Sequence, residues 1–276
     1  MLLWLQMTEI SLIPFDDGQC SIWDALVKSS KNGNFIHLRN YISYHGERFH
    51  EQSLLFFKRG KLVAVFPCNV VGDQVISHAG LTYAGLIYGP ELHAIDVLKI
   101  FELLASYYRS LGYKHIIYKA IPHVFHRYPA EEDLYALYRL SARIIRRDIS
   151  TVIPVGYRIK WSDSRKNTIR KAHKSGFLVR ETDKITEFHA LLSDTLNEHR
   201  AKPTHSCTEL TLLYQRFPEQ IRLFGVFSKE EEKLIAGALI FDFGEVVHSQ
   251  YLASSPIGKK TGALDLLLAE LLSTIF

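Results

Sequence analysis

The fold is decided by residues 222–250, which read RLFGVFSKEEEKLIAGALIFDFGEVVHSQ. Three apolar runs, at 221–228, 234–243 and 246–253, are separated by the charged turn KEEEK and by a turn at Gly244-Glu245. Short runs rich in Val, Ile, Leu and Phe between turns of this kind are typical of antiparallel strands. The stretch therefore predicts a three-stranded β-meander.

The same order of elements occurs earlier, at residues 54–78, LLFFKRGKLVAVFPCNVVGDQVISH. Pro67 lies within its middle run and predicts a bulge or an edge position there. Each meander precedes a long apolar helix, expected at 94–111 and 258–276. This internal repeat predicts an α+β (mixed α/β) chain with two tandem domains, residues 1–150 and 151–276. Each domain is expected to hold a mainly antiparallel meander sheet flanked by helices.

The two copies differ after their long helices. In the first copy a buried strand is expected at 114–120, KHIIYKA, whereas the second copy ends with its helix. The second domain is therefore expected to lack its C-terminal strands. We favour a truncated form of a longer protein, and the alternative is an oligomer in which a neighbouring chain covers the exposed sheet edge.

Caps and periodicity predict the remaining elements. Helices are expected at 21–30 with Ser21 as the cap, from Pro129 onward, at 184–200 and at 207–217, and the last two are joined by the polar loop AKPTHS. Strands are expected in NFIHL after Gly33, at 151–155 and at 177–181.

A short helix from Asp163 to Ser175 is the most basic element of the chain. Ser162 or Ser164 can cap its start, and Gly176 can end it in the left-handed conformation. Helical spacing predicts a packing face and a separate cationic face. The packing face carries Ile169 and Ala172, and the cationic face carries Lys166, Arg170, His173 and Lys174.

Charge is focused on this helix and its flanks. Residues 158–180 hold eight Lys or Arg against one acid, a local net charge of +7, while the whole chain carries +4 and the remainder therefore −3. A cationic site on a slightly acidic body favours a phosphorylated small-molecule ligand over DNA. The alternative interpretation is a solvated helix whose charges serve solubility.

Composition excludes several classes of protein. The opening MLLWLQM is too short for a signal peptide, and no run approaches the roughly 18 apolar residues of a membrane span, so a cytoplasmic protein with no membrane span is expected. Cys20, Cys68 and Cys207 follow neither a disulfide nor a zinc pattern. His123 and His126 lie three apart without an acidic or sulfur ligand beside them, so no metal site is expected.

Residues 81–90, LTYAGLIYGP, combine glycines with tyrosines. Glycine lets a backbone approach a ligand closely, so Tyr83 and Gly85 are candidate substrate-binding residues. A structural turn explains the same pattern equally well.

A meander followed by a glycine-bearing loop and a helix that packs back on the sheet resembles the core of GNAT acyltransferases. A tandem pair of such domains, with RKNTIRKAHKSGFLV opening the second, is similar to the Fem family of peptidoglycan aminoacyl transferases and their GNAT-type relatives. The resemblance spans most of the chain. It depends on the run IAGALIF, on HSQYLASS after it, and on Arg165, Asn167, Arg170, Lys171, Ala172 and Gly176.

The resemblance implies an N-acyltransferase that moves an acyl or aminoacyl group onto an amine of a cell-envelope precursor, such as an amino sugar or a peptide, in a cleft between the domains. Donors and acceptors of this kind carry phosphates that a cationic helix can neutralise. The expected substrate-binding residues of that helix are Arg165, Lys166, Asn167, Arg170 and Lys171.

The chain departs from the family pattern in two places. GNAT enzymes hold the pyrophosphate of the acyl-CoA donor with a Q/R-x-x-G-x-G/A loop, and the nearest match is Lys260, Thr261 and Gly262, with Leu264 in the last small position. Fem enzymes that use tRNA carry a long helical hairpin in the second domain, which this sequence does not contain. Its absence argues against a tRNA donor.

Amide formation needs a base for the amine and donors for the oxyanion. Alternation along VVHSQYLA predicts that His248 and Gln250 share one face and that Ser249 and Tyr251 share the other. His248 is the candidate base and Tyr251 a candidate acid toward a leaving thiol, with direct transfer and no covalent enzyme intermediate. The alternatives are that these are ordinary sheet residues, and that the chain is a non-catalytic GNAT-like binding module for a phosphorylated ligand.

Overall fold

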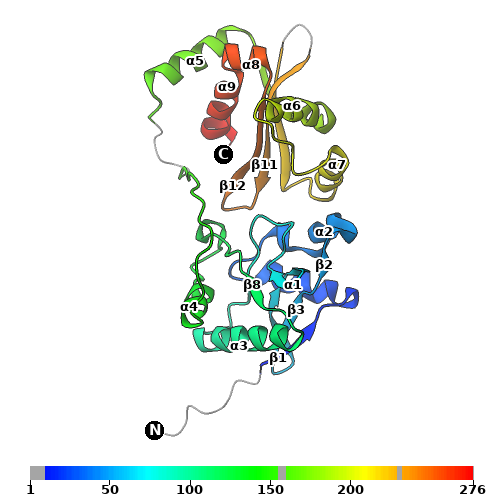
Figure 1. The fold of residues 1–276 in the computed structure, drawn as a ribbon. Coiled ribbons are helices and arrows are strands. Elements are labelled where there is room, and N and C mark those ends of the chain that lie inside the picture. Colours follow the sequence, from blue (N-terminus) through cyan, green and yellow to red (C-terminus); the bar gives the residue numbers. More distant parts are fainter. Residues whose placement is uncertain (1–9, 155–159, 229–231, 276) are drawn as a thin grey trace. The chain divides into compact units, whose positions relative to one another are not determined.

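The computed structural model of this 276-residue protein describes residues 10–154, 160–228 and 232–275 (Figure 1). The chain divides into two compact units, residues 1–146 and 147–276, which we call unit 1 and unit 2. Several predictions fall outside the described residues: the opening MLLWLQM, Val155 in the strand expected at 151–155, Arg158 in the cationic stretch, and most of the KEEEK turn.

Unit 1 combines helices with short strands. Its helices are α1 (Cys20–Ser29), α2 (Arg39–Ile42), α3 (Ala94–Ser110) and α4 (Glu132–Arg139), with 3-10 turns η1 (Asp17–Gln19), η2 (Phe35–His37), η3 (Ser43–Arg48) and η4 (His123–Phe125). Its strands are β1 (Ile10–Pro14), β2 (His50–Glu51), β3 (Leu54–Lys58), β4 (Lys61–Phe66), β5 (Asn69–Val71), β6 (Gln74–Ile76), β7 (Ile87–Tyr88) and β8 (His115–Ile117).

The meander of unit 1 is divided between two sheets. One has the order β1-β3-β4-β7 and the other β2-β5-β6-β8, and among the described strands of unit 1 only the β6–β8 pair is parallel. The middle run ends its first strand at Phe66, because Pro67 has no N–H to donate to the ladder. Cys68 then donates its N–H to Ser53 Oγ at 3.0 Å, and the chain continues as β5 in the second sheet.

Helix α3 covers the first sheet because its apolar residues recur at helical spacing. The buried residues of this face pack on Leu54, Phe56 and Phe66, and they are Val97, Ile100, Phe101, Leu104 and Tyr108. Gly112, at φ +89°, follows the end of the helix.

Unit 2 keeps its meander in one antiparallel sheet of order β12-β11-β10-β9. The strands are β9 (Leu178–Glu181), β10 (Ile221–Phe227), β11 (Leu234–Asp242) and β12 (Val247–Ser254). The helices are α5 (Asp163–Lys174), α6 (Ile185–Asn197), α7 (Cys207–Arg216), α8 (Pro256–Thr261) and α9 (Ala263–Glu270), followed by a π-helical turn η5 (Leu271–Ile275).

Helices cover both faces of this sheet (Figure 1). On one face Ala236, Ala238 and Ile240 pack against Leu267 of α9. On the other face α6 lies so close that a Cβ at Gly237 would be 2.7 Å from the Phe188 ring. Gly237, the glycine of IAGALIF, therefore leaves room for the Phe188 ring of α6 against the middle strand.

The α+β class with antiparallel sheets flanked by helices is confirmed. The basic helix is also confirmed: Ser162 Oγ accepts from Arg165 N, and Gly176 has φ +69°. The expected helix at 258–276 is divided, because Gly262 adopts φ +79° between α8 and α9.

Four local predictions are wrong. Ser21 is not the cap of α1, which begins at Cys20 after the turn η1. NFIHL forms a 3-10 turn instead of a strand, because the Asn34 side chain caps it. The strand expected at 114–120 is short and half-exposed, since β8 is an edge strand. Residues 151–154 form no strand and pair with none in the described ranges.

Candidate functional site

Strand β12 contains a β-bulge that changes which of its side chains share a face. Tyr251 pairs with Leu239 and Ser249 pairs with Ile240, so Gln250 has no partner in the register. Directly paired residues of an antiparallel ladder point to the same face, and a bulge shifts the alternation by one residue. His248, which pairs with Phe241, therefore lies on the face of Tyr251. The predicted separation of His248 from Tyr251, and the predicted grouping of Ser249 with Tyr251, are wrong.

Tyr251 is joined to a histidine that comes from a different part of unit 2. Its hydroxyl lies 2.8 Å from Nδ1 of His205, and the two rings meet edge to face. His205 is buried and follows helix α6 in the loop that leads to α7. The backbone oxygen of His205 accepts a hydrogen bond from His189 Nε2 at 3.0 Å. These contacts connect β12, the loop and α6.

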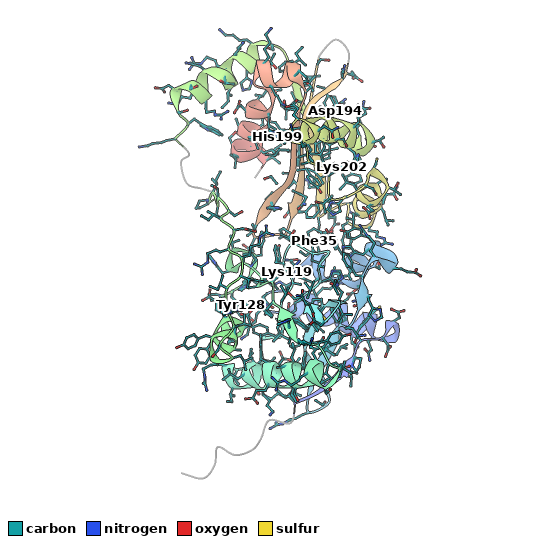
Figure 2. All side chains as sticks on the ribbon, in the orientation of Figure 1. Phe35, Lys119, Tyr128, Asp194, His199 and Lys202 are labelled. Carbon is teal, nitrogen blue, oxygen red and sulfur yellow. The ribbon has the colours of Figure 1, made fainter. Side chains whose placement is uncertain are left out.

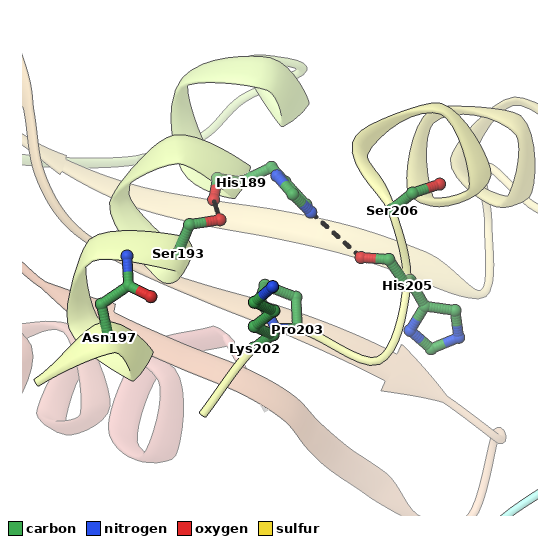
Figure 3. Close-up of a pocket in the computed structure, with 7 residues that line it drawn as sticks. All are labelled: His189, Ser193, Asn197, Lys202, Pro203, His205 and Ser206. Atoms are coloured by element: carbon green, nitrogen blue, oxygen red, sulfur yellow. Dashed lines mark hydrogen bonds between the residues drawn. The ribbon is translucent and has the colours of Figure 1, made fainter. Parts of the chain in front are cut away.

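A pocket of about 320 Å³ lies beside this connection (Figure 3). Helix α6 contributes His189, Ser193 and Asn197, and the loop that leads to α7 contributes the rest of the lining: Lys202, Pro203, His205 and Ser206. The volume is at the lower end of the range for small-molecule sites.

Helix α6 has two faces with different roles. Ile185, Phe188 and Leu192 are buried against the sheet. His189, Ser193 and Asn197 recur every four residues, which places them together on a second face that lines the pocket. The helix is fixed to the end of β12, where Thr195 Oγ1 accepts from Ser254 N at 3.3 Å. The pocket wall is therefore held against the strand that carries Tyr251.

The pocket lining carries positive charge. Lys202 is an exposed cation, and no Asp or Glu is among the seven lining residues. Figure 2 labels Lys202 in unit 2, on the stretch that leaves α6. Ser206 caps α7 by accepting from Glu209 N, so the positive end of that helix also faces this region.

His248 is half-buried on β12, and burial lowers its pKa below the ordinary value. Desolvation disfavours the imidazolium form. The neutral ring, which can accept a proton, is therefore the dominant form at pH 7.

The predicted substrate-binding helix α5 is mostly occupied by contacts within unit 2. Arg165 forms a close ion pair with Asp265 of α9, and Lys166 pairs with Asp163 at 3.0 Å. Arg170 donates to Asn167 Oδ1 at 3.1 Å. Lys171 is exposed and forms no ion pair within the described residues. The acids that pair with Arg165 and Lys166 come from α9 and from the first turn of α5.

Lys260, Thr261 and Gly262 do not form an open loop. Lys260 and Thr261 belong to helix α8, and the Thr261 hydroxyl donates to Ile257 O at 2.8 Å. Gly262 N donates to Gly258 O at 2.9 Å, and Thr168 of α5 packs against Gly262. Most of the polar groups expected to meet a pyrophosphate therefore already have partners inside unit 2.

Tyr83 and Gly85 belong to unit 1, and the structure gives both a packing role. Tyr83 is 7% exposed and stacks on Phe125 with ring centroids 4.8 Å apart. Gly85 has φ +66°, and a Cβ there would lie 2.7 Å from the Tyr118 hydroxyl. The close approach that the sequence indicates at Gly85 is to Tyr118.

Two further searches concern the described residues as a whole. No group of three His, Cys, Asp or Glu side chains among them is placed to hold a metal ion. In the same residues, no helix combines the length and the apolar character that crossing a bilayer requires.

Sequence reasoning missed the pocket residues. Its description of 201–206 stops at a polar loop, although His205 is one of the few buried polar residues of unit 2. The spacing of His189, Ser193 and Asn197 is a usable signal, because polar residues at i, i+4 and i+8 form one helix face. Contact between His205 and Tyr251 joins residues 46 apart and has no such signal.

Comparisons with known proteins give structural likeness only. No family model matches the chain, and no curated protein matches it. A solved structure of FemX is similar with a TM-score of 0.60 at 13% identity, covering 95% of this chain and 85% of FemX.

Two further solved structures are similar over most of the chain. L-PGS from Bacillus licheniformis gives a TM-score of 0.53 at 12% identity, covering 93% of this chain and 74% of that protein. The C-terminal domain of a putative lysylphosphatidylglycerol synthetase from Agrobacterium fabrum gives 0.54 at 10% identity, covering 92% and 74%. The chain has a GNAT-like fold of the kind seen in FemX, as the sequence resemblance implied.

Proposed function

We propose that the protein is an N-acyltransferase that moves an acyl or aminoacyl group onto an amine of a cell-envelope precursor, such as an amino sugar or a peptide. The observation that carries the proposal is the Tyr251–His205 contact of 2.8 Å on the bulged strand, beside a pocket of small-molecule size. The GNAT-like fold shared with FemX supports acyl transfer as the reaction class. The precursor is suggested by the resemblance to the Fem family.

In the proposed reaction the amine nitrogen attacks the acyl carbonyl carbon, and the bond from that carbon to the leaving sulfur or oxygen breaks. His248, kept neutral by burial, takes the proton that the amine loses. The Gln250 carboxamide, freed from the register by the bulge, donates to the oxyanion. Tyr251 gives its proton to the leaving group, and His205 orients the tyrosine hydroxyl.

Acyl-CoA is the proposed donor, as a substrate and without a metal. Its phosphates would meet Lys171 and the exposed side of α5, together with Lys260. The closed arrangement around Thr261 and Gly262 makes backbone contacts to a pyrophosphate a smaller contribution than in the family pattern.

An amine-dependent release of free thiol from acyl-CoA donors tests the proposal. Acceptors to be compared are amino sugars, nucleotide-linked amino sugars and short peptides. Tyr251→Phe should lower kcat by roughly 100-fold with little change in KM, because proton transfer contributes about that factor. The matched control is Tyr138→Phe, since Tyr138 is exposed in unit 1. Thiol release that is independent of the amine, or equal in both variants, would contradict the proposal.

A second candidate function is a non-catalytic module that binds a phosphorylated ligand. The exposed Lys171 on α5, without an ion pair in the described ranges, favours it. A thermal-shift panel of CoA, acyl-CoA, nucleotide sugars and RNA identifies the ligand class, because a ligand at 100 times its Kd stabilises by about 2.7 kcal/mol. Stabilisation by acyl-CoA without amine-dependent thiol release would favour the binding module. Stabilisation by nucleotide sugar alone would exclude acyl-CoA as the donor.

A further inference from the structure

The positive charge of the pocket beside α6 indicates the sign of the charge on its ligand. Lys202 contributes a full positive charge and forms no ion pair with any described residue. The nearby acid Glu209 is already used, because its carboxylate accepts from Ser206 N at 2.8 Å. A cation in a partly enclosed site without a compensating acid favours an anionic group on the ligand.

Asn197 supplies neutral donors next to this cation. It is the last residue of α6, and its carboxamide makes no hydrogen bond within the described part of the chain. The negative end of α6 opposes an anion by up to about 1 kcal/mol, but its last carbonyls are occupied. Leu196 O accepts from the N–H groups of His199 and Ala201, and Asn197 O accepts from Arg200 N.

The other end of the pocket offers acceptors. A carbonyl oxygen can only accept, so His189 donates from Nε2 to His205 O, and in this tautomer Nδ1 remains as an acceptor. Ser193 donates its hydroxyl proton to His189 O at 2.8 Å, which leaves its oxygen as an acceptor as well (Figure 3). Both positions suit the N–H groups of an amine.

We infer that this pocket binds a small molecule that carries both an amine and a carboxylate, with Lys202 and Asn197 on the carboxylate and with His189 and Ser193 on the amine. The inference rests on the proposed function in one respect, because the bound amine would be the acyl acceptor. A carboxylate is chosen over a phosphate because the site offers one Lys and one carboxamide and no Arg fork.

The helix also sets the spacing of the two groups. Ser193 and His189 precede Asn197 by four and eight residues, which corresponds to roughly 6 and 12 Å along a helix. A flexible ω-amino acid such as 6-aminohexanoate spans this range and is a suitable probe. Its matched analogues are 6-aminohexanamide, which lacks the carboxylate charge, and 2-aminoethyl phosphate.

The test is binding of the three probes to the full chain by NMR titration, without an acyl donor. We expect 6-aminohexanoate to bind at least about tenfold more tightly than 6-aminohexanamide, because a charge-assisted contact is lost in the amide. Lys202→Met should remove this preference by weakening only the carboxylate probe. Asn197→Asp should weaken the carboxylate probe further, since it adds a like charge.

The control is Lys233→Met, which removes an exposed cation of the same unit outside the pocket and should change nothing. Equal binding of acid and amide, no binding of 6-aminohexanoate, or an unchanged preference in Lys202→Met would overturn the inference. Tighter binding of 2-aminoethyl phosphate than of 6-aminohexanoate would overturn the inference that the ligand's anionic group is a carboxylate and would indicate a phosphate. Because no donor is present, retained binding with failed acyl transfer would count against the proposed function alone.

Discussion

Unit 1 and unit 2 build their sheets from the same pattern of runs and turns, but they treat charged groups differently. In unit 1, Lys31 pairs with Glu132 at 2.6 Å and Lys58 pairs with Asp96 at 2.8 Å, and all four side chains are less than a quarter exposed. Each ion pair between the described residues of unit 2 includes a side chain at least 46% exposed. Unit 1 therefore has buried ion pairs beside its exposed ones, whereas every ion pair between described residues of unit 2 has an exposed member.

The strands differ in a related way. At Pro67 the meander of unit 1 passes from one sheet to the other. Directly after this proline, the Ser53 hydroxyl accepts a hydrogen bond from the Cys68 N–H. The meander of unit 2 stays in one sheet and absorbs two irregularities as bulges, at Ile235 and at Gln250. A bulge re-aims neighbouring side chains without ending the pairing. The β3–β4 pair of unit 1 also has a bulge, at Val63, so the two meanders differ in whether the chain changes sheet and not in the presence of bulges.

The largest expected effect is on the buried ion pair of unit 1. Glu132→Gln leaves Lys31 buried without a counter-charge, and breaking a buried pair costs about 3 kcal/mol or more. Hydrogen exchange followed by mass spectrometry should show faster exchange across unit 1 and unchanged exchange in unit 2. The matched control is Glu102→Gln, which removes an exposed pair on α3 and should cost less than about 1 kcal/mol. Equal effects of the two variants would contradict the contrast between the units.

Acid should also affect unit 1 more than unit 2. Burial lowers the pKa of His37 to about 4 and that of His78 to about 3, and both rings are almost fully buried. A lowered pKa means that the unfolded chain binds the proton first. The stabilising contribution is therefore complete above pH 6.5 and is lost as the pH falls below that value.

The size of this effect follows from linkage. Between pH 7 and pH 5 each of the two histidines should remove about 2 kcal/mol of unfolding free energy. Asp133 acts in the opposite direction, because burial raises its pKa to about 6. The folded chain therefore binds this proton first, which adds about 1 kcal/mol to the unfolding free energy between pH 7 and pH 5. The net loss for unit 1 is then about 3 kcal/mol, measured by urea unfolding and hydrogen exchange at the two pH values. An equal loss in both units would contradict the assignment.

The sequence predicts well the features that depend on neighbouring residues. Helix α5 begins at its Ser162 cap and ends before Gly176, because capping and the left-handed C-terminal residue are local effects. The three strands of unit 2 agree with their apolar runs within one or two residues. The left-handed turn at Gly112 is likewise a local feature of the pattern.

What could not be predicted depends on distant contacts. The bulge at Gln250 follows from the register between β11 and β12, and one extra residue reverses the faces of His248 and Tyr251 relative to simple alternation. The contact of His205 with Tyr251 joins residues 46 apart and depends on how α6 and its following loop pack on the sheet. Asp265 neutralises Arg165 across 100 residues, which no charge count along one helix can detect.

The smallest expected effect on the unfolding free energy concerns the exposed charges of helix α5 in unit 2. The double substitution of Lys166→Ala and Arg170→Ala removes exposed charges whose partners are Asp163 and Asn167. The unfolding free energy should change by less than about 1 kcal/mol, because exposed pairs contribute little and alanine favours the helix.

In the same variant, binding of a nucleotide diphosphate should weaken several-fold and lose part of its salt dependence, measured by calorimetry at two ionic strengths. Arg165→Ala is the control for packing, because it breaks the tie between α5 and α9 and leaves Lys166 and Arg170 in place. If the double variant instead loses the folded state, α5 is a structural element and its charges are not a ligand site. Unchanged affinity in a folded variant would show that Lys166 and Arg170 do not bind the ligand, which leaves Lys171, Lys260 and the pocket beside α6 as the candidate anion sites that we propose in unit 2.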